Sequence, residues 1–324
     1  MNDGTFAPVV DIGAGAGFAG DRTDGAGPVV EALARSPRPA FLMYEMLAER
    51  TLADAQLAKR QDPAAGYSPR LRAFLQTSLA PAREAGIRIV GNFGAANPRG
   101  AAAEVLRLAR DLGLGRLRVG IVEGDDLLAS PGALDDALGE RRDGAPVAAN
   151  AYLGADGIAE ALDREADVVV TGRVADPSLA LGPLRHALGW AAQDWDRLAA
   201  GTLAGHLLEC GGQVTGGYFC DPGFKDVPGM DDLGFPIGEV DADGGIVITK
   251  AEDTGGLVDR ATVTEQILYE VHDPAAYLTA DVVLEPGANT LTVLAINGEG
   301  FTTTYSAVTY YETAELAHSW LSAQ

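Results

Sequence analysis

Short apolar runs alternate with longer segments of helical apolar spacing through the first half of the chain. The short runs have the length and the content of β-branched residues that are typical of buried strands. We expect strands at residues 8–12, 40–44, 87–92, 117–122, 147–152 and 167–171. We expect helices at residues 47–60, 68–85, 99–112, 133–141 and 155–164. This alternation predicts an α/β fold, a mostly parallel sheet with helices on both faces that is doubly wound and Rossmann-like, with a barrel as the alternative.

The pattern changes after residue 172. Residues 177–189 and 195–210 have helical spacing, a Gly-rich stretch follows, and further apolar runs from residue 246 onward indicate more strands. We therefore divide the chain into an α/β core of residues 1–225 and a smaller strand-containing C-terminal region of residues 226–324. The 324 residues are enough for one large domain or two ordinary ones.

The charge balance narrows the classes of partner. The chain has 46 acidic and 24 basic side chains and a net charge of −22, so it would be repelled by nucleic acids and anionic membranes. Its first residues do not resemble a signal peptide, and no apolar run approaches the roughly 18 residues that span a bilayer. Two cysteines exclude a framework of several disulfides. We expect a cytoplasmic protein that binds neither nucleic acid nor membrane.

A Gly-rich loop, DIGAGAGFAGDR, follows the first apolar run. Gly15, Gly17 and Gly20 match the dinucleotide-binding pattern, in which a helix begins at the third glycine and its positive end faces pyrophosphate. Glycines and a proline at residues 25–28 make a helix start near Pro28 more plausible here. The delayed start argues against phosphate binding.

A polar pocket wall is the better interpretation of this loop, with Asp21 and Arg22 facing the substrate. Glu45 at the end of the second strand could stand for the ribose-binding acid, which keeps nucleotide binding open as a weaker alternative. Polar segments also follow the other expected strands, among them EMLAERT, NFGAANP, EGDD, NAYLG and TGRVADPS. Because the carboxyl ends of parallel strands meet at one edge, these segments predict a shared site there.

Two groups of carboxylates leave the question of a metal open. Glu45 and Glu49 would share one helix face, which suits a shared proton or a metal but also an ordinary charged surface. Glu123 and Asp125 supply the oxygen ligands that hard divalent cations need, or else begin a helix. The sequence therefore identifies no cofactor, and a divalent metal stays open.

Arg173 follows a run of valines at the end of the sixth expected strand. A guanidinium at that point would hold a carboxylate or phosphate through two parallel hydrogen bonds. Asp176 lies just before the helix expected from Pro177, where it would serve first as a cap.

His206 and Glu209 form the densest catalytic candidate. They stand three residues apart before a Gly-rich turn, and a histidine beside a carboxylate is the usual arrangement for acid–base chemistry near neutral pH. Cys210 would be a nucleophile only as a thiolate, and the dipole at a helix C-terminus disfavours that charge.

An ordered set of strings carries a family resemblance: IGAGAGFAGDR, YEMLAERT, GNFGAANP, VEGDD, ANAYLGA, VTGRVADPSL and GHLLECGGQVTGGYF. Together they resemble the acyclic terpene utilisation AtuA family over about residues 8–283, and the sequence after Val283 departs from the family pattern. The resemblance implies a link to bacterial catabolism of citronellol and geraniol through acyl-CoA intermediates, but no reaction. The matching positions that we expect to bind substrate are Gly15, Gly17, Asp21, Arg22, Asn92, Asn97, Glu123, Asp125, Asn150, Asp176 and Gln213.

These observations predict an enzyme of small-acid or acyl-CoA metabolism, a lyase or hydratase that uses acid–base chemistry. The expected catalytic residues are His206, Glu209, Arg173 and Glu45. We expect a homo-oligomer. A non-catalytic subunit that binds a small anion is the alternative from another class. An ester or thioester hydrolase is a further alternative, although the chain has no Gly-x-Ser-x-Gly elbow.

Overall fold

Strands form at most of the apolar runs of the chain. The structure is a computed structural model that describes residues 8–129, 131–138, 146–271, 273, 276–296 and 302–312. Its strands are β1 (Val9–Ala16), β2 (Ala40–Tyr44), β3 (Arg88–Gly91), β4 (Val119–Val122), β5 (Val168–Thr171), β6 (Pro236–Asp241), β7 (Ile246–Lys250), β8 (Tyr277–Leu278), β9 (Val283–Ile296) and β10 (Thr302–Glu312).

Helices fill most of the intervals between the strands. The α-helices are α1 (Ala26–Arg35), α2 (Glu49–Gln61), α3 (Leu71–Glu84), α4 (Pro98–Asp111), α5 (Pro131–Leu138), α6 (Asp156–Asp163), α7 (Ser178–Leu188), α8 (Trp195–Leu208) and α9 (Arg260–Leu268). Short 3₁₀ helices are η1 (Leu127–Ala129), η2 (Gly211–Gln213) and η3 (Met230–Asp232).

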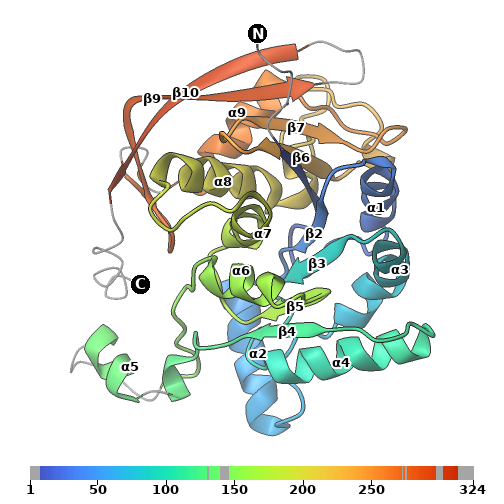
Figure 1. The fold of residues 1–324 in the computed structure, drawn as a ribbon, viewed down its shortest axis with the longest axis vertical. Coiled ribbons are helices and arrows are strands. Elements are labelled where there is room, and N and C mark those ends of the chain that lie inside the picture. Colours follow the sequence, from blue (N-terminus) through green and yellow to red (C-terminus); the bar gives the residue numbers. More distant parts are fainter. Residues whose placement is uncertain are drawn as a thin grey trace.

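The strands form one open mixed sheet in the order β10-β9-β7-β6-β1-β2-β3-β5-β4, with β8 paired to β9 (Figure 1). Neighbouring strands from β1 to β4 in this order are parallel, whereas β6 runs antiparallel to β1 and β7 antiparallel to β6. No pairing between described strands closes the sheet into a barrel. The predicted α/β fold with a mostly parallel core is confirmed.

Alternation of side chains along β2 builds two hydrophobic layers. Phe41 and Met43 pack with the residues of α6, α7 and α8, while Leu42 and Tyr44 pack with α1, α3 and α4 on the opposite face (Figure 1). The chain crosses the sheet in one direction from β1 to β3, and then β5 returns between β3 and β4. Since crossovers between parallel strands are right-handed, this reversal moves α6 to the other face, where α7 packs against it.

One local prediction needs correction. The strand expected at residues 147–152 is wrong, since Asn150 makes only an isolated bridge with Asp126. The backbone N–H of Leu127 donates to the carbonyl of Ala149 and that of Ala151 to the carbonyl of Asp125, so residues 149–151 pair with the loop after β4 instead. The delayed helix start predicted after the Gly-rich loop is confirmed, since α1 begins at Ala26, two residues before Pro28 and well after Gly20.

The second region of the chain extends the first sheet, because β6 pairs with β1. The division at residue 225 stays a prediction.

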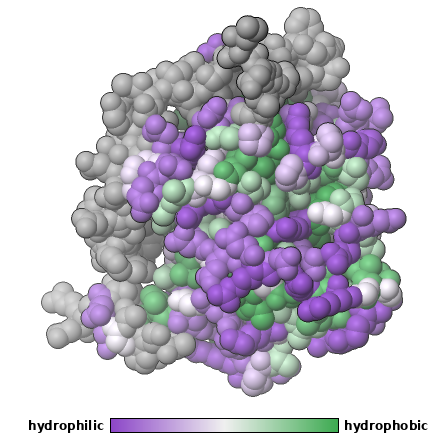
Figure 2. Space-filling model, in the orientation of Figure 1, coloured by the Kyte–Doolittle hydropathy of each residue, from purple (hydrophilic) through white to green (hydrophobic). Residues whose placement is uncertain are grey.

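Hydrophilic side chains cover most of the described surface on the face shown in Figure 2. Within the part of the chain that the structure describes, no helix has the length and apolar character needed to cross a membrane.

Candidate functional site

A cavity of about 710 Å³ lies at the carboxyl ends of β1, β2 and β5, where the segment after α8 closes it. The crossovers after β3 and β5 leave to opposite faces of the sheet, which is the position where open α/β sheets usually bind ligands. The predicted site residues that line the cavity are Gly17, Asp21, Arg22, Glu45, Arg173, Asp176, Glu209 and Gln213. Those that do not line it are Gly15, Asn92, Asn97, Glu123, Asp125, Asn150 and His206.

The Gly-rich loop packs against the protein itself. A Cβ on Gly17 would lie 2.2 Å from the backbone carbon of Cys210, and one on Gly15 would lie 2.6 Å from the ring of Tyr44. Asp21 accepts the backbone N–H of Gly17 at 2.9 Å and that of Arg22 at 2.8 Å. Burial nevertheless raises the pKa of Asp21. These glycines allow the loop to approach the end of α8 and the ring of Tyr44.

Glu45 is a buried carboxyl on the cavity wall. Its Oε1 accepts the backbone N–H of Leu47 at 2.7 Å and the side-chain amide of Asn92 at 2.9 Å. The side-chain oxygen of Asn92 accepts the backbone N–H of Met46 at 2.7 Å, so Asn92 holds this loop from behind. Burial raises the pKa of Glu45 to about 7, although the charge of Arg173 opposes the shift. Near neutral pH this carboxyl exists in both protonation states.

Arg173 is buried with 1% exposure at the end of β5. Its Nη1 donates to the carbonyl of Leu47 at 2.5 Å, its Nε donates to the carbonyl of Val174 at 2.8 Å, and its Nη2 pairs with Asp176. The guanidinium carbon lies 4.5 Å from the ring centre of Tyr152. A guanidinium has five N–H groups, so one on each terminal nitrogen is left for a ligand.

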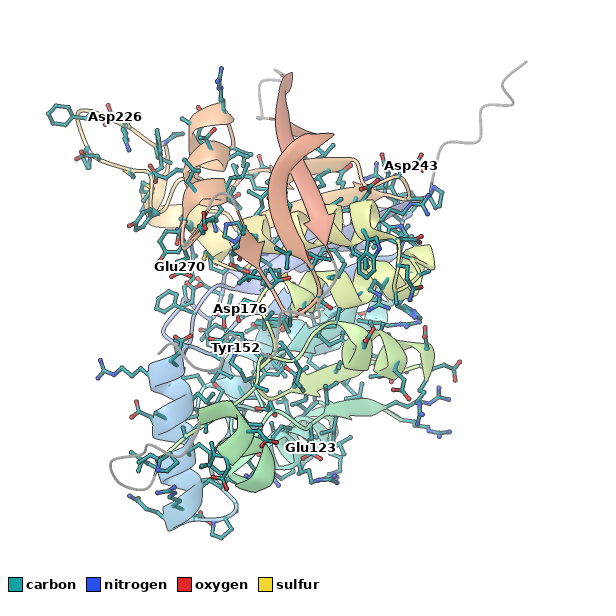
Figure 3. All side chains as sticks on the ribbon, turned by 90° about the vertical axis from the view of Figure 1, so that its left-hand side faces the viewer. Glu123, Tyr152, Asp176, Asp226, Asp243 and Glu270 are labelled. Atoms are coloured by element: carbon teal, nitrogen blue, oxygen red, sulfur yellow. The ribbon has the colours of Figure 1, made fainter. Side chains whose placement is uncertain are left out.

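A second carboxylate positions the loop that carries Arg173. Asp125 accepts the backbone N–H of Arg173 at 2.9 Å and the amide of Asn150 at 2.8 Å. Glu123, from the same acidic run, lies on the surface 2.6 Å from Arg99. Figure 3 shows Tyr152, Asp176 and Glu270 close together, with Glu123 well below them. Through the two hydrogen bonds of its carboxylate, Asp125 joins Asn150 to the backbone of Arg173, so both residues contact the site from behind.

Asn97 stabilises a helix rather than contacting the cavity. Its side-chain oxygen accepts the backbone N–H of Gly100 at 2.9 Å at the start of α4. Its amide donates to the carbonyl of Ala65 at 2.8 Å, which fixes the loop before α3. Asn97 therefore joins the start of α4 to the loop before α3.

His206 lies behind the cavity wall and Glu209 lies in it. The Nδ1 of His206 is 3.1 Å from Oε1 of Glu209, and its Nε2 is 2.8 Å from the carbonyl of Gln266. Burial lowers the pKa of His206, but the charge and hydrogen bond of Glu209 outweigh it, and the pKa is raised overall. The pKa of Glu209 is also raised, and here burial is the main cause. The pair thus retains a proton more strongly than two isolated groups.

Cys210 borders the cavity as a thiol. Burial, followed by the charge of Glu209, raises its pKa to about 12. It therefore stays protonated at neutral pH, which agrees with the argument against a thiolate nucleophile, although burial is the first cause.

Acidic side chains dominate the cavity wall. Among the described lining residues, only Arg22 and Arg173 are cationic. The seven carboxyl groups are those of Asp21, Glu45, Glu49, Asp176, Glu209, Asp231 and Glu270. No cluster of three or more His, Cys, Asp or Glu residues in the described ranges is arranged to hold a metal ion.

Sequence reasoning missed several residues at this site. Tyr152 donates a hydrogen bond to Glu49, and Tyr218, Tyr269 and Glu270 line the cavity from the segments after α8 and α9. The string NAYLG contained Tyr152, but nothing in its spacing indicated contact with Arg173. The others come from stretches without a strand end or a motif.

Comparison with protein families identifies the chain. The model of the acyclic terpene utilisation family protein AtuA matches residues 10–295. The chain belongs to the AtuA family. This membership connects the chain with acyclic terpene utilisation. The match extends beyond Val283, the residue after which the sequence motifs no longer resembled the family. Comparisons with curated proteins and with solved structures gave no match.

The close approach of the Gly-rich loop in this AtuA-family chain predicts the effect of a methyl group. Gly17→Ala would place its Cβ against the backbone of Cys210 and Gly211 and should lower the free energy of unfolding by about 1–3 kcal/mol. Gly27→Ala in α1 has no atom within 4 Å of the new Cβ and should be neutral or stabilising by up to about 1 kcal/mol. Urea unfolding of both variants measures the difference, and equal effects would contradict the packing argument.

Proposed function

We propose that this chain is a cytoplasmic acid–base enzyme, a lyase or hydratase, that acts on a small acid or an acyl-CoA in acyclic terpene utilisation. The supporting observation is Glu45, a buried carboxyl on the cavity wall whose pKa lies at about 7. Proton transfer is fastest when the catalytic pKa is near the working pH. Glu45 is therefore the group that we assign to proton exchange with a substrate carbon.

The position of Glu45 suits that assignment. Both of its hydrogen bonds reach Oε1, and no donor among the described residues reaches Oε2. Asn92 and the backbone of Leu47 fix the carboxyl through Oε1, and Oε2 is the oxygen that we assign to proton exchange with the substrate. Glu209 lies in the same wall and its charge acts on Glu45, so the two carboxyls titrate together.

The charge of the cavity limits what enters it. Seven carboxyl groups face two arginines, so a diphosphate would be repelled from the interior. For an acyl-CoA, only the acyl end would lie in the cavity, and the nucleotide would stay outside. The remaining N–H groups of Arg173 would bind the carbonyl or carboxylate of the substrate and stabilise an enolate. A homo-oligomer remains part of the proposal.

The first experiment measures turnover of acyl-CoA thioesters and free acids, with and without a hydroxyl group. Glu45→Gln keeps the Oε1 acceptor for Leu47 and Asn92 but cannot exchange a proton. We expect kcat to fall by about a hundredfold to ten-thousandfold with little change in KM.

Glu31→Gln on the exposed side of α1 is the matched control and should keep full activity. Full activity of Glu45→Gln would refute the assignment of the proton transfer. Ligand binding without turnover of any member of the panel, with or without added metal, would support a non-catalytic binding subunit instead.

The raised pKa of Glu45 also predicts how stability depends on pH. Its folded-state pKa of about 7 lies above the ordinary glutamate pKa of 4.5, so the stability of the folded protein falls as pH rises between these values. The Glu45→Gln variant has no carboxyl at this position and does not lose stability in this way. Its free energy of unfolding relative to that of the wild type should therefore rise by roughly 2 to 3 kcal/mol between pH 5 and pH 8.

Urea unfolding of the two proteins at both pH values measures this gain. The difference between Glu31→Gln and the wild type should not change with pH. A constant difference for Glu45→Gln would mean that the carboxyl is not protonated near neutral pH.

A further inference from the structure

Two buried polar atoms on the turn after α8 have no hydrogen-bond partner among the described residues. They are Oε2 of Glu209 and Nε2 of Gln213, and both residues line the cavity. Glu209 has only 5% exposure. Buried polar atoms nearly always pair with protein, water or a ligand, so the acceptor and the donor left open on this wall are available to a ligand group.

The proton between His206 and Glu209 determines the state of Oε2. The carbonyl of Gln266 only accepts, so the Nε2 that lies 2.8 Å from it must carry a hydrogen. Nδ1 lies 3.1 Å from Oε1 of Glu209, and two lone pairs at that distance would repel each other. One proton therefore lies between Nδ1 and Oε1. Whether the imidazole or the carboxyl holds it, Oε2 carries none and is an acceptor.

The neighbouring charged and titratable groups do not change this conclusion. Glu270 and Arg173 act on Glu209 through their charges, and the hydroxyl of Tyr277 lies 3.5 Å from Nδ1. They shift the shared proton toward one partner or the other. They do not move it from Oε1 to Oε2, because only Oε1 faces the imidazole.

A ligand that pairs with both open groups must offer a hydrogen-bond donor to Glu209 and an acceptor to Gln213. A carbonyl or carboxylate oxygen only accepts, and an ammonium group only donates, whereas an alcohol oxygen does both. We propose that Glu209 and Gln213 bind the hydroxyl group of an alcohol substrate, with His206 as a positioning residue behind Glu209. This inference rests on the proposed function only in taking the cavity as the substrate site.

The bound hydroxyl group would favour cleavage of a C–C bond over elimination of water. With the shared proton on Nδ1 of His206, the ionised carboxylate takes the hydroxyl proton at Oε2, the O–H electrons form a C=O bond, and the neighbouring C–C bond breaks. Its electron pair stays on the carbon that leaves, and protonated Glu45 supplies a proton to that carbon. Loss of water would instead need a proton donor at the hydroxyl, where Oε2 has no proton to give.

The ligand preference is measured by NMR titration of the whole chain with cyclohexanol, cyclohexanone and cyclohexylamine, which share one carbon skeleton. We expect the alcohol to bind about tenfold more tightly than the ketone, because the ketone leaves Oε2 unpaired. Glu209→Gln should remove the advantage of the alcohol, whereas Glu31→Gln should keep it. Equal affinities, tighter binding of the ketone or the amine, no binding of the alcohol, or an unchanged preference in Glu209→Gln would overturn the proposal.

The state of His206 supplies a second measurement that needs no altered cavity. The chain has four histidines, so loss of one signal set in His206→Gln assigns its ring nitrogens in ¹⁵N spectra. In the wild type we expect Nε2 to stay protonated from about pH 5 to pH 8. A neutral form protonated on Nδ1 would overturn the proposal. Neither measurement uses turnover, so each can fail while the turnover test of Glu45 succeeds, and the reverse holds too.

Discussion

The buried guanidinium of Arg173 is the interaction on which the site depends. It joins the loop after β5 to the loop after β2 through the carbonyl of Leu47, and it pairs with Asp176. Its charge also lowers the pKa values of Glu45, Glu49 and Glu209 relative to what burial alone would give. Without this cation the cost of burying so many carboxyls in one wall would rise, because like charges at short range raise one another's pKa values. Arg173 is therefore both a structural clamp and the main opposing charge.

The sheet explains why this clamp is available. Parallel strands deliver the ends of β2 and β5 to one edge, and the reversal of the chain between β3 and β4 opens that edge between helices of opposite faces. Polar segments collect there because the valine-rich strand interiors leave no room for them. Arg173 lies two residues after Thr171, the last residue of β5, and Glu45 directly follows Tyr44, the last residue of β2. The residues that follow these two strands therefore form facing walls of the cavity.

The sequence contained most of this arrangement, but not the direction of individual side chains. The valine run before Arg173 and the polar segments after the strands were enough to predict the parallel sheet and the edge that carries the cavity. Spacing could not separate Glu123 from Asp125, because neighbours in a loop point in directions set by their backbone. Nor could the spacing of His206 and Glu209 tell which of them faces the cavity, since residues three apart share a helix face in either case. Those distinctions depend on long-range contacts such as the one with Gln266.

The Gly-rich loop completes the site by a backbone contact rather than by a bound phosphate. Gly17 packs against Cys210 and Gly211, and Gly211 itself has a φ of 55°, a conformation that glycine adopts without strain. This contact fixes the turn that carries Glu209 and Gln213 relative to β1. Because the same turn is anchored from behind by His206, its two open polar atoms are held by the sheet on one side and by α9 on the other. A turn fixed from both sides holds its donor and its acceptor in place, which the proposed recognition of a hydroxyl group requires.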